Sequence, residues 1–272
     1  MKISKNELDS YRENGFLVQD SLVSTEETQE LVDCLTEFEK QTLPGHIQEK
    51  GSSIYRAFHG CHLYDKTYDA LIRKPELLQP ARQVLKDEVY IHQLKVNLKR
   101  PFSGELWPWH QDYVYWRNED KLPSNAMVSV MIFLDDITEF NGPLYFIPGS
   151  HHLGCIDVSK AKGSSDDWEG NVSASLTYQV TEEQVSSLVN QGGLFSAKGK
   201  KGTAIWFDGN LVHASPQNIS PFERRIVILT YNAVSNVPLD QNIEPRPAFL
   251  NGRDRQPLRE SIIGTLSHRE IN

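Results

Sequence analysis

The strongest constraint on the fold of this 272-residue chain is a change in the spacing of its apolar residues near position 89. Upstream, apolar side chains recur at helical spacing in the segment that follows Ser24, and a helix is also predicted over 75–85. Downstream, residues 89–98 alternate and are rich in β-branched and aromatic types, which is typical of a strand. Helices followed by strands indicate a sheet-based fold with helices packed outside it.

Several more apolar segments downstream have the length and composition of strands. A turn at Asn141-Gly142-Pro143 leads into one of them. The predicted strands cover residues 128–134, 144–147, 203–207 and 225–232. We therefore predict a mainly β protein with flanking helices, built on a double-stranded β-helix, the jelly-roll barrel of cupins. Such a barrel encloses a cavity whose mouth can hold a metal and a ligand.

No internal repeat or low-complexity linker divides the chain, so we predict one domain over 1–272. Its helical part covers about 1–88 and its barrel about 89–235. Residues 153–200 are polar, long and inserted between barrel strands, which is typical of a lid. The remaining C-terminal residues are rich in proline and are predicted to be irregular.

Composition limits the partners of the protein. A net charge of -8 argues against nucleic acid and against an anionic membrane, since both favour basic surfaces. The three cysteines form no CxxC pair, the N-terminal segment lacks an apolar core, and no apolar run approaches a membrane-spanning length. We expect a cytoplasmic protein, monomeric or homodimeric, that acts on a small molecule.

The most informative local motif is Trp109-His110-Gln111-Asp112. If these residues form a strand, His110 and Asp112 project into the same cavity, because side chains two apart point the same way. The motif alone is weak, since His268-Arg269-Glu270 repeats its form in a predicted surface tail.

A second segment strengthens the prediction, because His213 lies where a late barrel strand begins. Two histidines and one carboxylate form the facial triad of non-heme Fe(II) oxygenases, which leaves sites open for a 2-oxo acid and O₂. Arg224 or Arg225, at the start of the strand that follows, could bind the far carboxylate of 2-oxoglutarate in a two-pronged contact. Only one of the two adjacent arginines can face the interior.

The remaining histidines give no metal-ligand pattern. On the predicted strand 89–98, either His92 or Gln93 faces the barrel interior, and Gln93 is the better polar contact for a ligand. Five others lack partners at ligand spacing and are predicted to be structural: His46, His59, His62, His151 and His152.

Two long motifs resemble a known family. They are similar to motifs of the phytanoyl-CoA dioxygenase superfamily and, within it, of the ectoine hydroxylases. The first motif is WHQDYVYWRNEDKLP followed by NGPLYFIPGSH, and the second is HASPQNISPFERRIVILTYNAVSN. The resemblance covers about residues 8–240. It implies iron(II) and 2-oxoglutarate as cofactors, with O₂ as oxidant, and hydroxylation of an unactivated C–H bond with release of succinate and CO₂.

The resemblance also implies roles for individual residues. It identifies His110, Asp112 and His213 as iron ligands and Arg224, rather than Arg225, as the clamp for 2-oxoglutarate. It places three further polar groups near the co-substrate or substrate, and two aromatic groups against the substrate: Gln93, Ser129 and Ser215, then Trp116 and Phe207.

The chain also departs from the ectoine hydroxylases. Ile226 and Ile228 replace a polar and an aromatic residue after the clamp arginine, and Arg117 replaces a histidine of the first motif. The two isoleucines predict a substrate with an aliphatic side chain, namely a free, leucine-like amino acid. Ectoine or another amino-acid-derived metabolite is the alternative substrate for the same chemistry.

Two other classes of protein remain open from sequence. Zinc sites can also use two histidines and a carboxylate, so a Zn²⁺ or Mn²⁺ enzyme is one alternative, although it leaves the Arg224 spacing unexplained. A non-catalytic β-sandwich binding module is the other, and it would show exposed aromatic residues without a tight metal site.

Overall fold

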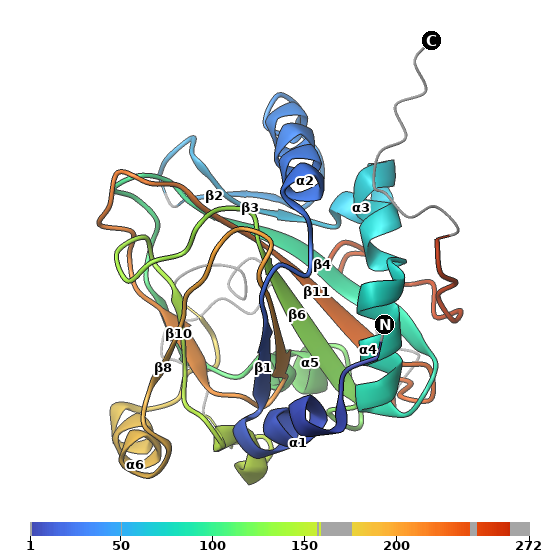
Figure 1. Ribbon diagram of the computed structural model, residues 1–272, viewed down its shortest axis with the longest axis vertical. Helices are drawn as coiled ribbons and strands as arrows, with labels where there is room; N and C mark the ends of the chain where they lie inside the picture. Colours follow the sequence, from blue (N-terminus) through green and yellow to red (C-terminus); the bar gives the residue numbers. More distant parts are fainter. Residues whose placement is uncertain (1, 50, 157, 159–175, 240–243, 262–272) are drawn as a thin grey trace.

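Two antiparallel sheets face each other in the computed structural model, with most helices outside the larger one (Figure 1). The structure describes residues 2–49, 51–156, 158, 176–239 and 244–261. The larger sheet has the strand order β1-β9-β6-β11-β4-β3-β2, and the smaller has β5-β10-β7-β8. This arrangement confirms the predicted mainly β fold with flanking helices.

The strands are short except for the two at the centre of the larger sheet. In sheet order, the larger sheet contains β1 (Phe16–Gln19), β9 (Ala204–Asp208), β6 (Met127–Phe133), β11 (Arg224–Ala233), β4 (Val89–Lys99), β3 (Tyr55–His59) and β2 (His46–Gln48). The smaller contains β5 (Trp107–His110), β10 (His213–Ser215), β7 (Leu144–Phe146) and β8 (Phe195–Ala197). The long pair β4 and β11 therefore forms the base on which the site is built.

The helices begin at residues suited to capping. Ser4, Ser24 and Thr181 each form a capping box, in which the side chain accepts from the helix backbone and a Glu or Gln returns a bond. The helices are α1 (Lys5–Asn14), α2 (Thr25–Phe38), α3 (Lys66–Ile72), α4 (Pro75–Leu85), α5 (Asp112–Glu119) and α6 (Glu182–Gly192), with 3₁₀ turns η1 (Cys61–Leu63) and η2 (Ser150–Leu153). Helices α3 and α4 lie on the side of the larger sheet opposite β8 and β10 (Figure 1).

Strand β4 shows how the larger sheet separates core from site. Its residues Leu94, Val96 and Leu98 belong to the main hydrophobic core, which α2, α3 and α4 share with the sheet. Burying each leucine contributes about 2 kcal/mol. The alternate residues Gln93 and Lys95 line a pocket on the other face. The period of two along this strand thus directs polar groups inward.

The predicted strands over 89–98, 128–134, 144–147, 203–207 and 225–232 correspond to β4, β6, β7, β9 and β11, with ends that differ by at most one residue. One local prediction was wrong. Strand β5 ends at His110, and Asp112 is the first residue of α5, so the motif is a strand-to-helix junction rather than a continuous strand. Gln111 is the extended N-cap residue between them.

Two segments outside the predicted barrel strands contribute to this fold. Within 153–200, β8 pairs with β7, whereas residues 157 and 159–175 lie outside the described residues, so the lid stays a prediction. The segment 244–261 has no helix or strand, but it packs on β4: the Gly252 amide donates to the His92 carbonyl at 2.7 Å. None of the described helices is long and apolar enough to span a membrane.

Candidate active site

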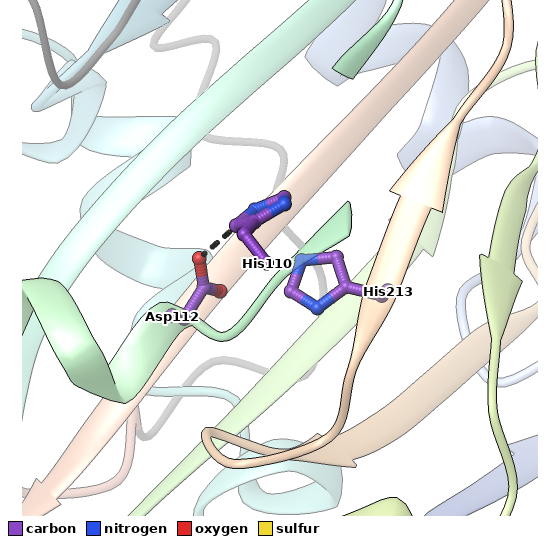
Figure 2. A group of neighbouring side chains, drawn as sticks. All are labelled: His110, Asp112 and His213. Carbon is purple, nitrogen blue, oxygen red and sulfur yellow. Dashed lines mark ion pairs between the residues drawn. The ribbon is translucent and has the colours of Figure 1, made fainter. Parts of the chain in front are cut away.

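Three side chains that can bind a metal meet between β5, α5 and β10. His110 and His213 face each other across the antiparallel pair β5 and β10, with ring centroids 4.1 Å apart. Asp112 reaches them from the first turn of α5, and its Oδ1 lies 3.8 Å from His110 Nε2 (Figure 2). One potential ligand atom from each residue lies within 4.8 Å of the others. The second HxE motif, His268 to Glu270, lies outside the described residues.

The two imidazoles are oriented by their own backbone. His110 Nδ1 is 2.7 Å from the Pro108 carbonyl and His213 Nδ1 is 2.9 Å from the Leu211 carbonyl. Each Nδ1 therefore carries the hydrogen, and each Nε2 keeps its lone pair for a metal. Burial lowers the pKa of both rings, that of His110 to about 3, so both are neutral as metal binding requires.

The carboxylate completes a donor set that suits iron. Asp112 is buried, and its Oδ2 has no hydrogen-bond partner in the described part of the chain. Burial acts to raise its pKa, but Lys95, whose Nζ lies 3.8 Å from Oδ1, and the two histidines lower it overall. A buried, ionised carboxylate beside two imidazole nitrogens fits a divalent metal of the oxygenase type.

Arg224 lies in the same pocket as the three potential ligands. It is 1% exposed, and its Nε and Nη1 have no hydrogen-bond partner among the described residues. Its Nη2 is 3.5 Å from Ser215 Oγ. Burial lowers the pKa of Arg224 to about 9, so at neutral pH a buried, charged guanidinium is open to an anion. Arg225 instead pairs with Asp135 on the opposite face, at 2.6 Å.

Lys99, the cross-strand partner of Arg224, is a buried lysine whose pKa is lowered to about 6 by burial. Lys99 is 1% exposed, and its Nζ donates to the backbone carbonyls of Glu105, Ser215 and Pro216. A Cβ on Gly142, which has a φ of +81°, would lie 2.7 Å from the Lys99 side chain, so glycine is required there. Lys99 thereby connects β4 to the end of β10, beside Ser215.

A second arginine reaches the pocket. Arg246, from the irregular C-terminal segment, lines it and is held by Asp120 through two bonds of 2.8 and 2.6 Å. Asp120 is buried and also contacts His92 and Asn251. Burial acts to raise the pKa of Asp120, but Arg246 and His92 bring it to about 2. Two arginines therefore line the pocket: Arg246 is paired with a carboxylate, whereas two nitrogens of Arg224 have no hydrogen-bond partner among the described residues.

The structure brings together most, but not all, of the predicted site residues. The pocket is lined by all three potential metal ligands and by Arg224, Gln93, Ser215, Trp116 and Ile228. Three predicted contacts lie behind its wall instead. Ser129 is bonded to Thr230, whereas Phe207 and Ile226 pack in the inner hydrophobic cluster and are fully buried.

Other lining residues were missed from the sequence. Lys95 and Asn97 follow Gln93 at the strand period of two, so that pattern could have identified them. Trp107 and Tyr115 belong to the aromatic-rich segment 107–116 around the HxD motif, and such a segment is typical of a lined substrate pocket. Arg246 has no local signal, because only the fold brings it to the pocket.

Comparison with known proteins decides the family. The model of the phytanoyl-CoA dioxygenase family matches residues 11–226. The chain belongs to this family. It is therefore an iron- and 2-oxoglutarate-dependent dioxygenase, and the Zn²⁺ or Mn²⁺ enzyme and the binding module are not supported.

Characterised relatives act on small metabolites. L-proline trans-4-hydroxylase of Streptomyces griseoviridis is 37% identical over 263 residues, which cover 95% of this chain and 97% of the relative. Ectoine dioxygenase of Bordetella bronchiseptica is 34% identical, covering 92% and 83% of the two chains. The crystal structure of EctD from S. alaskensis with 2-oxoglutarate and 5-hydroxyectoine matches with a TM-score of 0.82 and 31% identity, over 97% of this chain and 89% of EctD. EctD with bound Fe matches similarly, at 0.80. The enzyme is thus a hydroxylase of a small metabolite.

Proposed function

We propose that the enzyme hydroxylates an unactivated C–H bond of a free amino acid with a compact aliphatic body, and that L-proline is the first substrate to test. The observation that carries the proposal is the presence of a second arginine in the pocket. Arg246 lines it, and Asp120 occupies two of its nitrogens, which fixes the guanidinium in place. A substrate with a carboxylate at one end fits this arrangement. The similarity to an L-proline hydroxylase supports the same class of substrate.

In this proposal His110, Asp112 and His213 hold iron(II), and Arg224 binds the far carboxylate of 2-oxoglutarate. Iron bound there supplies the activation of O₂, with 2-oxoglutarate as the source of two electrons and succinate and CO₂ as its products. The chain orients both organic molecules through its two arginines, which line the same pocket. Trp107, Tyr115 and Trp116 line the space between and exclude water from it.

The choice of substrate depends on the wall between the two arginines. The sequence predicted a leucine-like substrate from two isoleucines, but Ile228 lines the pocket and Ile226 does not. Only one of the two isoleucines therefore supports a leucine-like substrate. L-leucine remains a second candidate because Leu144 lies near Ile228 in the same wall, and ectoine is a third because ectoine dioxygenases are similar over most of the chain.

Separate incubations with L-proline, L-leucine and ectoine test the proposal. Each contains the enzyme, Fe(II), 2-oxoglutarate and O₂, and both succinate and hydroxylated product are measured by mass spectrometry. We expect stoichiometric hydroxyproline and succinate with L-proline. Arg246→Met should raise the KM for L-proline about ten- to a hundredfold, the effect of losing a charged hydrogen bond. Product from ectoine or L-leucine alone would replace the proposed substrate.

The metal assignment has its own test, which does not require turnover. Anaerobic Fe(II) titration with 2-oxoglutarate should produce a visible charge-transfer band in the wild type. We expect the band to be lost in His213→Ala but kept in His151→Ala, because His151 contacts the backbone of Arg12 and lies outside the pocket. A normal band in His213→Ala would contradict the assignment.

A further inference from the structure

His59 is a buried polar group that neither the metal centre nor the co-substrate site uses. It is the last residue of β3, is 5% exposed and lines the same pocket as Gln93 and Arg246. Its Nδ1 is buried without a hydrogen-bond partner among the described residues. Because a buried polar group without a partner costs free energy, such a ring in a pocket wall points to a partner that arrives with the ligand.

The charges around His59 indicate the kind of partner. Burial, with the positive charges of Lys95, Arg246 and Arg56, lowers its pKa to about 3. Lys95 is its direct cross-strand neighbour on β4. The imidazole is therefore neutral and lies in a region of positive potential. A neutral imidazole always keeps one N–H donor.

We propose that His59 donates a hydrogen bond from its imidazole N–H to the carboxylate of the amino-acid substrate, beside Arg246, and so selects amino acids over their neutral amides. This inference rests on the proposed function. His59 is a substrate-binding residue here, distinct from the groups that hold iron(II) and 2-oxoglutarate.

A hydrogen bond in the reverse direction, in which His59 is the acceptor, does not fit the site. His59 could instead accept a hydrogen bond from the ammonium or ring N–H₂⁺ of the substrate. The three cations that lower its pKa would repel that positive group, whereas they attract a carboxylate. A carboxylate also has enough lone pairs to accept from Arg246 and from the imidazole at the same time.

The backbone holds His59 firmly in place. Its amide donates to the Gly45 carbonyl at 2.9 Å. Gly60, which follows it at a φ of +72°, lies so close to Phe249 that a Cβ would be 2.6 Å from the Phe249 Cβ. The C-terminal segment that carries Arg246 is thus seated directly on the turn after His59, so the two donors are positioned together.

The test uses four variants and two probes. His59→Leu removes the donor, and His59→Gln retains an N–H. The matched control is His62, whose Nδ1 is likewise buried without a described partner and whose pKa burial lowers to about 4, but which does not line the pocket. His62→Leu and His62→Gln complete the set. The probes are L-proline and L-prolinamide, which differ only in the carboxylate.

Two measurements are made on each variant. Steady-state turnover gives KM for L-proline and for 2-oxoglutarate. Anaerobic quenching of tryptophan fluorescence gives Kd for both probes without turnover, since Trp107 and Trp116 line the pocket. We expect His59→Leu to raise the Kd and KM for L-proline about ten- to a hundredfold. The Kd for L-prolinamide and the KM for 2-oxoglutarate should stay within about twofold of the wild-type values. His59→Gln should recover most of the lost affinity for L-proline.

The other outcomes would reject either the role of His59 or the proposed function. Equal weakening of both probes, or an equal effect of His62→Leu, would mean that His59 acts only through the fold. Unchanged L-proline affinity in His59→Leu, with normal wild-type hydroxylation, would reject the role of His59 and leave the proposed function standing. A wild type that neither binds nor hydroxylates L-proline would reject the proposed function, and the role of His59 with it.

Discussion

Gln111, the residue between His110 and Asp112, connects the two segments that carry the proposed metal ligands. Gln111 is 1% exposed, and its Nε2 donates to the carbonyls of Gly154 and Asn210, at 2.9 and 2.5 Å. Its Oε1 accepts from the Ile156 amide at 2.8 Å. Asn210 lies just before the strand that carries His213, so this one side chain fixes the distance between the two halves of the site.

We therefore expect Gln111→Leu to be costly, although leucine has a similar size. It leaves two carbonyls and one amide buried without partners, at about 1–3 kcal/mol each. The free energy of unfolding should fall by about 3 kcal/mol or more, and Fe(II) should bind at least tenfold more weakly. Urea denaturation and anaerobic Fe(II) titration measure the two effects.

The control for this variant is Gln19→Leu. Gln19 also uses both ends of its amide, on Trp206 and Glu7, but it lies on β1 outside the pocket. It should lose stability and keep its affinity for Fe(II). If both variants bind Fe(II) as the wild type does, Gln111 supports the fold but does not position the ligands.

At the scale of single elements, helix α5 connects the metal centre to the residue that holds Arg246. Asp112 is its first residue, and Asp120 follows its last. The first contributes to the metal centre, and the second holds Arg246. A displacement of this helix would therefore change the iron site and the substrate site together.

Asp120→Asn separates these roles, because it removes the charge that pairs with Arg246 and leaves Asp112 untouched. Breaking a buried ion pair costs about 3–5 kcal/mol. We expect a lower Tm, a KM for L-proline raised tenfold or more, and an unchanged KM for 2-oxoglutarate. Asp135→Asn is the control, since it breaks the Arg225 pair outside the pocket. Equal kinetic effects of the two variants would contradict a specific role for Asp120.

Sequence patterns revealed the elements whose signals are local. The strands β4, β6 and β11 were predicted because each is a long apolar run or alternation, and the ligands because both motifs are contiguous. Helix α5 was missed because it begins inside a motif that has the spacing of a strand. Arg246 and His59 could not be found this way. Arg246 reaches the pocket through its bonds to Asp120, 126 residues earlier in the chain, and His59 through the pairing of β3 with β4, and no local period records either contact.

The whole molecule combines a net negative charge with a pocket that contains an unpaired cation. Its net charge is -8, yet Arg224 is buried in the pocket, and two of its nitrogens have no hydrogen-bond partner among the described residues. The burial of Arg224 is unfavourable without an anion, and a carboxylate of 2-oxoglutarate would supply one. The general acidity limits binding of other polyanions, while the pocket retains its attraction for small ones.

Buried histidines make the stability of the iron-free protein sensitive to acid. Burial lowers the pKa of His59 to about 3 and that of His62 to about 4, from an ordinary value near 6.5. Between these values the unfolded chain binds protons that the folded chain does not, so stability rises with pH and is lost as pH falls from about 6.5 to 4. Asp120, with a pKa of about 2, acts only at lower pH.

His62→Gln isolates one of these contributions, because glutamine cannot be protonated. The pKa of His62 corresponds to a loss of about 3 kcal/mol between pH 7 and pH 4, at about 1.4 kcal/mol per unit. Urea denaturation of both iron-free proteins across this range should give a shallower decline for the variant, by about 2–3 kcal/mol. Parallel declines would mean that His62 is protonated in the folded state as readily as in the unfolded one, and that its burial does not limit acid stability.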